Sequence, residues 1–459
     1  RAVISSGSAE DVAGLAAPGS SLEEFYLLQK LLRGLGSDNV DHRLQQQDFS
    51  GDDAAPAIPG LEIPIAGIDD AKAVLLVGSN LRKEQPLLSV RLRQAVVRNG
   101  ATVGSVNVMD YPQTFELCEC AVAPPSRLAA TLAGVAMAVA RSRNVDLPEE
   151  ISKLTDSPAL EQTAAALLEA GENGLLLLGA NAAQNAAASS LHAIAQWIAE
   201  QTGARIGLLP TANSAAAWLA GCIPHRGPHG HPVERSGRNT AEMMANGQRA
   251  FVLLGTEPEL DSLDGAAARK AMRNAEFVVQ ISPFVSETMM DCADVLLPMA
   301  AYTEAAGTYV NCEGRVQRST AATNPAGESR PAWKILRVLG NFFELSGFDQ
   351  ITLEDVQAEV APGEPAPSAR QSGSHPGVSV DHAAHGTIGG LERIVDMPMY
   401  RGESTLRHAA ALQKTADNPP PALRVHPDSL SALNLEAGQS AVLRRGNDRE
   451  ITLPVAADS

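Results

Sequence analysis

Three apolar runs in the sequence each end in a glycine that is followed by polar residues. The runs read AVLLV, LLLL and FVLL, and the turns after them read Gly-Ser-Asn, Gly-Ala-Asn and Gly-Thr-Glu. Glycine lets the backbone approach a ligand closely, and open parallel sheets bind ligands at the carboxyl ends of their strands. The pattern therefore predicts candidate pocket residues at Gly78, Asn80, Gly179, Asn181, Gly255 and Thr256. Alternatively, the three segments are simply tight turns between a strand and a helix.

A second polar set lies in residues 304–315, where Glu304, Asn311, Glu313 and Arg315 offer polar groups between short predicted strands. Gly307 and Gly314 are expected to provide sharp turns. These polar side chains could contact a ligand, which makes Glu304 and Asn311 further pocket candidates. The favoured interpretation is a network that satisfies its own hydrogen bonds and holds a loop.

Histidine and cysteine patterns give no convincing metal or catalytic site. His225, His229 and His231 have spacings that can bind zinc or copper. The glycines and proline between them indicate a surface loop, and no fourth ligand is nearby. The five cysteines are scattered and odd in number, which favours reduced thiols in a cytoplasmic protein. Dinucleotide, phosphate-loop and hydrolase-elbow motifs are also missing, so no catalytic residue is assigned.

The elements that would position these turns form a repeating pattern. Each apolar run is followed by a predicted helix (86–98, 187–201 and 266–273) and then by a second strand (102–108, 205–209 and 277–281). An earlier helix is predicted over residues 22–35, where Ser21 and Glu24 form a capping box. Runs that are apolar throughout suit parallel strands covered on both faces. The sequence therefore predicts an α/β fold with doubly wound parallel sheets.

Composition limits the classes of partner. The 459 residues carry a net charge of −17, which disfavours nucleic acid and anionic lipid. The apolar runs are shorter than the roughly 18–20 residues that span a bilayer, so direct membrane insertion is not expected. The first residues form neither an initiator methionine nor a signal peptide, and we expect the chain to be a piece of a longer protein.

Three stretches carry a resemblance to a known family. Residues 304–317 read EAAGTYVNCEGRVQ and follow the segment DVLLP. Together they resemble the "E-x-x-G-T-[FY]-x-N-x-E-G-R-x-Q" region of the molybdopterin oxidoreductase superfamily. GSDNVD, at residues 36–41, is similar to that family's "G-[ST]-x-N-[VI]-D" segment, and residues 78–81 match its "G-x-N-[PL]" turn. Within the superfamily, residues 26–31, 41–44 and 391–394 look most like the large iron–sulfur subunit of bacterial NADH–quinone oxidoreductase.

The resemblance implies two interleaved lobes, one formed by residues 1–36 and 151–361 and the other by 37–150. Residues 362–390, rich in Pro, Gly, Ser and His, are predicted to be a linker. Residues 391–459 resemble a partial double-psi β-barrel.

The same resemblance implies a role in proton-translocating NADH–quinone oxidoreductase, or complex I, which passes electrons from NADH to quinone. This segment is then a non-catalytic scaffold in the peripheral arm, in contact with other arm subunits. It would be cytoplasmic and peripheral to the cell membrane through the complex. The 4Fe-4S and 2Fe-2S clusters of such subunits are expected upstream of Arg1, outside this segment.

The sequence departs from the family where its catalytic members bind molybdenum or tungsten. The region after Asp41 contains no thiol; it reads HRLQQQDFS, in which Asp48 is the one conceivable ligand. We therefore expect this segment to bind neither metal nor molybdopterin. Two alternatives stay open: a catalytic molybdopterin enzyme, such as a formate dehydrogenase or nitrate reductase, and a nucleotide-binding module without a redox role.

Overall fold

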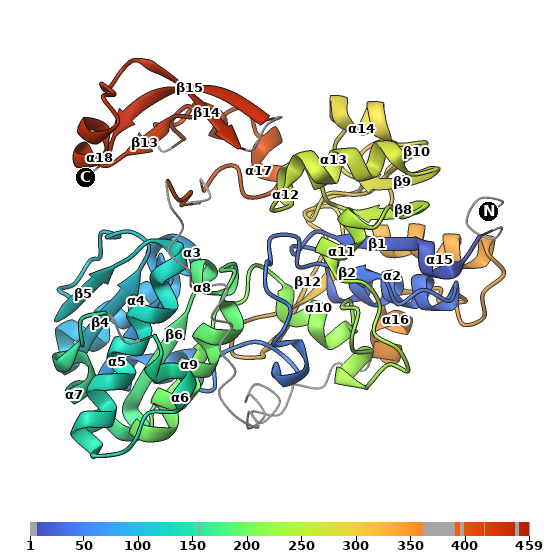
Figure 1. Cartoon of the computed structure of the whole chain (residues 1–459). Coiled ribbons are helices and arrows are strands. Elements are labelled where there is room, and N and C mark those ends of the chain that lie inside the picture. The colour runs from blue at the N-terminus through green and yellow to red at the C-terminus, as the bar shows by residue number, and fades with distance from the viewer. Residues whose placement is uncertain are drawn as a thin grey trace. The chain divides into compact units, whose positions relative to one another are not determined.

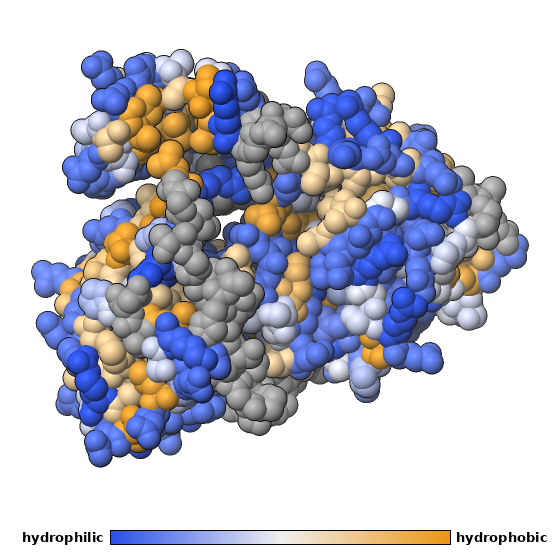
Figure 2. All heavy atoms as spheres, viewed as in Figure 1, coloured by the Kyte–Doolittle hydropathy of each residue, from blue (hydrophilic) through white to orange (hydrophobic). Residues whose placement is uncertain are grey.

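The chain forms two compact units, Arg1–Asp396 and Met397–Ser459, in a computed structural model (Figure 1). The structure describes residues 7–154, 157–360, 391–394, 399–416, 418–445 and 449–458. The predicted linker, residues 362–390, lies outside the described residues. Hydrophilic atoms cover most of the surface in view, with hydrophobic patches between them (Figure 2).

The first unit contains two five-stranded sheets in which every paired strand is parallel. Sheet A has the order β10-β9-β8-β1-β2 and sheet B the order β5-β4-β3-β6-β7. The strands of sheet A are β1 (Val12–Ala16), β2 (Val40–Asp41), β8 (Ala250–Leu254), β9 (Phe277–Ser282) and β10 (Val295–Pro298). Those of sheet B are β3 (Ala73–Val77), β4 (Thr102–Asn107), β5 (Glu119–Val122), β6 (Gly174–Leu178) and β7 (Arg205–Leu208). The predicted α/β class with doubly wound sheets is confirmed.

Helices cover both faces of both sheets, which explains why the central strands are apolar throughout. The helices of the first unit are α2 (Leu22–Gly34), α3 (Leu81–Glu84), α4 (Pro86–Asn99), α5 (Leu128–Arg143), α6 (Glu149–Ser152), α7 (Glu161–Ala170), α8 (Ala180–Ala183), α9 (Ala188–Thr202), α10 (Ser214–Ala220), α11 (Thr240–Ala245), α12 (Pro258–Asp261), α13 (Gly265–Asn274), α14 (Glu287–Cys292), α15 (Ala332–Phe342) and α16 (Leu353–Val360). None of the helices in the described ranges is long and apolar enough to cross a membrane.

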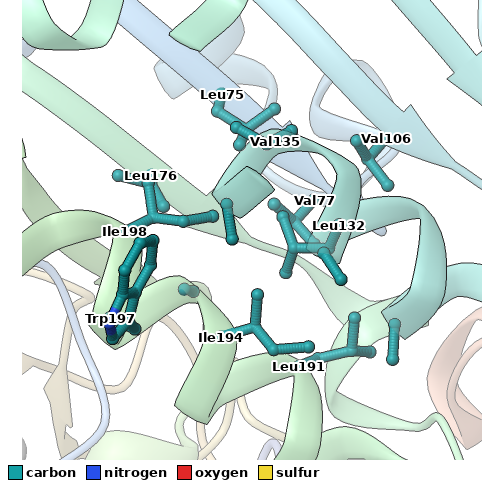
Figure 3. Close-up of a cluster of buried hydrophobic side chains, with 14 of the residues drawn as sticks. Leu75, Val77, Val106, Leu132, Val135, Leu176, Leu191, Ile194, Trp197 and Ile198 are labelled. Atoms are coloured by element: carbon teal, nitrogen blue, oxygen red, sulfur yellow. The ribbon is translucent and has the colours of Figure 1, made fainter. Parts of the chain in front are cut away.

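The largest buried cluster lies between sheet B and helices α5, α7 and α9. Figure 3 shows part of it, in which side chains of the sheet face those of α5 and α9, among them Leu75, Leu176, Leu132 and Ile194. A smaller cluster covers the other face of sheet B and includes Leu88 and Leu92 of α4. Sheet A is covered likewise, by α2, α10 and α15 on one face and by α11 and α13 on the other.

The predicted division into lobes needs correction. It assigned residues 151–361 to the first lobe, but β6 and β7 pair with each other and β6 pairs with β3, so sheet B extends from residue 73 to residue 208. It also assigned β2 to the second lobe, whereas Val40 pairs with Gly14 of β1 in sheet A. An apolar run fits any central position of a parallel sheet, so its sequence does not say which sheet it joins.

Two smaller sheets complete the fold. β11 (Gly307–Val310) and β12 (Val316–Ser319) form an antiparallel pair in the first unit. The second unit has a three-stranded sheet in which β15 (Arg449–Ala457) lies between β13 (Leu423–Val425), parallel to it, and β14 (Ser440–Arg445), antiparallel to it. Its helices are α17 (Ser404–His408) and α18 (Pro427–Ala432).

Candidate functional site

The predicted pocket residues in the glycine-containing turns, Gly78, Asn80, Gly179, Asn181, Gly255 and Thr256, lie at the points where the strand order of each sheet reverses. In sheet B the chain leaves β3 in one direction and returns through β6 on its other side, so the turns after β3 and β6 are neighbours. In sheet A the corresponding turns follow β1 and β8. Such reversal points are where open α/β sheets bind ligands. The structure thus brings Gly78, Asn80, Gly179 and Asn181 together, and places Gly255 and Thr256 at the other sheet.

The two turns of sheet B are packed tightly against each other. Gly78 has a φ of +54°, and a Cβ atom there would lie 2.5 Å from the backbone nitrogen of Ala182. A Cβ atom on Gly179 would lie 2.5 Å from the Cβ of Ser79. The amide of Asn181 donates to the carbonyl of Gly78 at 2.9 Å. The glycines therefore serve the close approach of one turn to the other.

A carboxylate of the chain itself accepts hydrogen bonds from amides of both turns. Glu84 Oε1 accepts from the backbone N–H of Asn80 at 2.6 Å, and Glu84 Oε2 accepts from that of Ala180 at 2.9 Å. Backbone amides at such turns are the donors that bind phosphate in nucleotide-type folds. Sequence analysis missed Glu84, although an acidic residue four positions after the end of a glycine-containing turn is a usable signal.

The remaining polar groups at this end of sheet B are largely paired within the chain. Asn181 Nδ2 donates to the Tyr111 hydroxyl at 2.9 Å, and Asn107 Nδ2 donates to the Ser79 carbonyl at 3.1 Å. Ser79 Oγ and Asn107 Oδ1 are buried without a hydrogen-bond partner. The turns are thus held mainly by internal bonds.

In the turn after β8 of sheet A, a carboxylate of the chain again accepts hydrogen bonds from groups of the turn. Asp261 Oδ2 accepts from Thr256 Oγ1 at 3.0 Å and from the backbone N–H of Glu257 at 2.7 Å. The carbonyl of Thr256 accepts from Gln280 Nε2 at 2.8 Å. Gly255 has a φ of +66°, which favours glycine. Here too a nearby carboxylate accepts from turn donors that could otherwise bind an anion.

The segment after Asn39-Val40-Asp41, where a metal ligand would be expected, is held by a buried ion-pair network. Asp41 is fully buried, and its two carboxylate oxygens accept from Arg43 Nε at 2.9 Å and Nη2 at 3.0 Å. Arg43 Nη1 also donates to Asp52 Oδ1 at 2.6 Å. Burial alone would lower the pKa of Arg43, but the carboxylates of Asp41 and Asp52 hold it above its usual value. The Arg43 guanidinium group and the carboxylates of Asp41 and Asp52 therefore bind each other.

The groups beside this network are uncharged. Burial lowers the pKa of His42 to about 4, and its Nδ1 lies 3.0 Å from the Cys222 carbonyl oxygen. His42 Nε2 is buried without a partner. Burial raises the pKa of the Cys222 thiol. The region therefore offers a neutral imidazole and a neutral thiol, whereas metals bind the thiolate.

Asp48, the conceivable metal ligand, is bound to backbone and hydroxyl groups. Its Oδ1 accepts from the N–H of Ser50 at 2.9 Å and from Ser50 Oγ at 2.6 Å, and its Oδ2 accepts from the N–H of Ser189 at 2.8 Å. Ser189 lies in the first turn of α9, where a carboxylate is favoured electrostatically. Asp48 thus joins the 48–50 segment to α9.

Glu304 and Asn311 lie away from the reversal points, around the β11–β12 pair. Asn311 Oδ1 accepts from the backbone N–H groups of Glu313 at 3.1 Å and Arg315 at 2.9 Å. Glu313 in turn accepts from the N–H of Ile65 at 2.7 Å, next to sheet B. Glu304 Oε2 accepts from the N–H of Ala301 at 3.2 Å. The bonds of Asn311 stabilise the turn between the two strands.

The three histidines of the 225–231 segment do not converge. The His225 side chain is largely buried, and its Nδ1 lies 3.2 Å from Asp52 Oδ2. His229 and His231 are exposed, and the centroids of their rings lie 6.5 Å apart in an edge contact. Across the described ranges no group of three or more His, Cys, Asp or Glu side chains could hold a metal ion.

The two sheets, each with a reversal point between helices on both faces, define an α/β protein of the doubly wound class. The family model described as Molybdopterin oxidoreductase matches residues 2–342, so the chain belongs to the molybdopterin oxidoreductase family. An acetylene hydratase from Pelobacter acetylenicus shares the fold, with a TM-score of 0.59 and 14% identity over 99% of this chain and 78% of that one.

Two of the relatives with curated descriptions are subunits of oxidoreductases. The chain is 27% identical over 336 residues to the mitochondrial NADH-ubiquinone oxidoreductase 78 kDa subunit of Candida albicans, a match that covers 73% of this chain and 40% of that protein. It is 25% identical over 400 residues to the NADPH-Fe(3+) oxidoreductase subunit alpha of Geobacter sulfurreducens, covering 74% of this chain and 46% of that one. The chain thus spans less than half the length of these relatives.

Proposed function

We propose that this chain is a segment of the large iron–sulfur subunit of a proton-translocating NADH–quinone oxidoreductase, in which it acts as a scaffold in the peripheral arm. The similarity to the 78 kDa subunit of Candida albicans supports the assignment. The observation that carries the scaffold role is the pair of carboxylates, Glu84 and Asp261, that accept from turn amides at both reversal points. In this proposal electrons pass through iron–sulfur clusters upstream of Arg1. The segment contacts other arm subunits and reaches the membrane only through them, on the cytoplasmic side.

We further propose that the segment binds no molybdopterin and no molybdenum or tungsten. The residues present do not fit such a group. The turns of sheet B are in backbone contact, and the candidate amides are bonded to carboxylates that would repel its phosphates. Elemental analysis of the full-length protein from molybdate-supplemented cells checks this, and near-stoichiometric molybdenum would favour the catalytic alternative instead.

The assembly experiment uses the full-length protein in its own cells. Leu76 of β3 is fully buried, so Leu76→Asp leaves a carboxylate without a partner in the core and unfolds the lobe. We expect the assembled complex on a native gel and NADH-dependent quinone reduction in membranes to fall together. The control is His229→Ala, a change outside the core that leaves both unchanged.

Two outcomes of this experiment would contradict the proposal. Normal NADH–quinone reduction after Leu76→Asp, with the chain itself degraded, would mean that it is not a subunit of that enzyme. Loss of turnover after His229→Ala at normal complex abundance would reveal a redox site in this segment.

A further inference from the structure

Helix α4 has two faces of opposite character. Leu88, Leu92 and Ala95 are buried, and the two leucines pack in the cluster under sheet B. Leu87, Val90 and Val97 point the other way, with 77%, 52% and 63% of their surface exposed. Residues three, seven and ten positions apart share one side of an α-helix, so these three aliphatic side chains form a stripe in which Gln94 lies between Val90 and Val97. Isolated exposed aliphatic residues are common on protein surfaces, but a stripe on one helix face is not.

Arginines flank this stripe on both sides. At about 100° per residue, Arg93 lies along one edge of the stripe and Arg91 and Arg98 along the other. Arg91 forms an ion pair with Asp69 at 2.7 Å. Arg93 and Arg98 have no ion-pair partner within the described residues. We define the α4 face as Leu87, Val90, Arg93, Val97 and Arg98.

The charge of this region is opposite to that of the whole chain. Residues 81–99 contain more basic side chains than acidic ones, in a chain with a net charge of −17. The acidic one, Glu84, accepts from the turn amides of Asn80 and Ala180. Asp69 of the neighbouring segment pairs with Arg91, so Arg93 and Arg98 are the arginines beside the stripe that have no carboxylate partner within the described residues, and a docked segment could supply one.

We infer that the α4 face is a docking surface for a segment of another polypeptide that presents aliphatic side chains flanked by carboxylates. The stripe supplies apolar area to bury, and Arg93 and Arg98 select the charge of the partner. This inference rests on the proposed function in one respect, because it takes the partner to be another subunit of the same complex. A second copy of this chain and an anionic membrane are the competing occupants.

The membrane is the less favourable competitor. The α4 face contains no tryptophan or tyrosine, the residues that anchor proteins at lipid interfaces. A net charge of −17 also opposes the approach of the chain to an anionic bilayer. A protein partner needs only a local match of charge.

The test places a photo-crosslinking amino acid at position 90 of the full-length protein in its own cells. The control places it at position 351, because Ile351 is 81% exposed and lies in the other lobe. We expect position 90 to crosslink to one other polypeptide, at a peptide whose sequence combines aliphatic residues with Asp or Glu. Position 351 should not give that product. A crosslink to lipid, to a second copy of this chain, to a peptide without acidic residues, or to nothing would overturn the inference.

Charge reversal tests the electrostatic part. Arg93→Glu together with Arg98→Glu should lower the yield of the position-90 crosslink on the order of tenfold, with an unchanged melting temperature. The control is Arg143→Glu, which changes the net charge half as much, at an exposed arginine at the end of α5 that has no ion pair within the described residues. An equal loss with Arg143→Glu would mean that net charge alone matters and would remove the case for a specific face.

The two proposals can fail separately. If the complex assembles on the native gel but position 90 gives no crosslink, the docking surface is wrong and the subunit assignment stands. If position 90 crosslinks to an acidic peptide of a protein outside NADH–quinone oxidoreductase, the docking surface stands and the subunit assignment is wrong.

Discussion

Single polar residues in this protein are held in networks of buried hydrogen bonds and ion pairs. Arg43 is the clearest case, because it bridges the carboxylates of Asp41 and Asp52 and lies over the ring of Trp218, 5.5 Å from its centroid. In a buried network of this kind each charge is tolerated only because its partner is present. The network therefore stabilises the segment in which catalytic members of the family would carry a metal ligand.

Removal of Arg43 should be far more costly than removal of an exposed arginine. Arg43→Ala leaves Asp41 buried without its partner, and we expect the free energy of unfolding to fall by about 3–5 kcal/mol. Arg141→Ala breaks an exposed ion pair with Glu161 and should cost less than about 1 kcal/mol. Urea denaturation of both variants measures the difference. Equal losses of unfolding free energy would show that the Asp41 network stabilises the protein no more than an exposed ion pair does.

His42 should make the protein less stable as the pH falls. Its pKa is about 4 in the folded state, against an ordinary value of 6.5, because burial disfavours the charged ring. A lowered pKa means that its contribution is complete above pH 6.5 and is lost as the pH falls through 4. At about 1.4 kcal/mol per pH unit the loss is on the order of 3 kcal/mol. Urea denaturation at pH values from 7 to about 4 should show that the unsubstituted protein loses stability relative to His42→Asn. A difference in unfolding free energy that stays constant with pH would contradict this.

Glu24 should act in the opposite direction. Burial and the neighbouring Glu23 raise its pKa from 4.5 to about 7, although the bond from the Ser21 amide opposes the shift. A raised pKa gives a contribution that is complete below pH 4.5 and is lost as the pH rises through 7. Glu24→Gln keeps an acceptor for the Ser21 amide and removes the titration. Between about pH 4.5 and 7.5 the unsubstituted protein should therefore lose stability relative to Glu24→Gln. Thermal unfolding of both proteins at several pH values measures the difference. A gain in the relative stability of the unsubstituted protein as the pH rises would mean that Glu24 is ionised in the folded state.

At the scale of elements, the strand–turn–helix units depend on close contacts between turns. Gly78 combines a left-handed backbone with a near approach to Ala182. Gly100, which ends α4, also has a positive φ, of +69°, but has nothing within 4 Å of a built Cβ atom. A comparison of substitutions at Gly78 and Gly100 therefore separates the free-energy cost of a left-handed backbone from the cost of a steric clash.

We expect Gly78→Ala to destabilise the protein more than Gly100→Ala. Both variants incur a backbone cost of about 1–2 kcal/mol. Gly78→Ala adds a clash between its Cβ and a backbone nitrogen that cannot rotate away, about 1–3 kcal/mol more. Differential scanning calorimetry compares the two variants, and equal melting temperatures would mean that the turns after β3 and β6 are not in firm contact.

Local patterns in the sequence were sufficient to predict these helices and strands, but they were insufficient to predict which strands pair. The capping box of Ser21 and Glu24 was predicted and is present, because both hydrogen bonds lie within one turn. Whether β6 joins β3 or β1 depends on which faces are buried in three dimensions, and an apolar run such as LLLL satisfies either choice. The position of Glu84 could have indicated its bond to the Asn80 amide, four residues away, but no local pattern indicates its bond to Ala180, 96 residues away.

At the scale of the whole molecule, each of the two units has its own sheets within the described residues. The strands β13, β14 and β15 pair only among themselves in the described part of the chain. The four buried apolar clusters found in the described residues extend no further than Val360. The stability of the two sheets in the first unit thus has its source within that unit.

A shortened chain that ends at residue 396 should therefore keep the fold of the first unit. Because its core and both five-stranded sheets are complete without Met397–Ser459, we expect its cooperative thermal transition at the same temperature as in the full chain. Leu76→Asp in the shortened chain serves as the unfolded reference. Calorimetry and near-ultraviolet circular dichroism measure the result, since Trp197 and Trp218 report on packing in each lobe. A broad transition with the weak near-ultraviolet signal of the reference would show that the second unit is needed for the packing of the first.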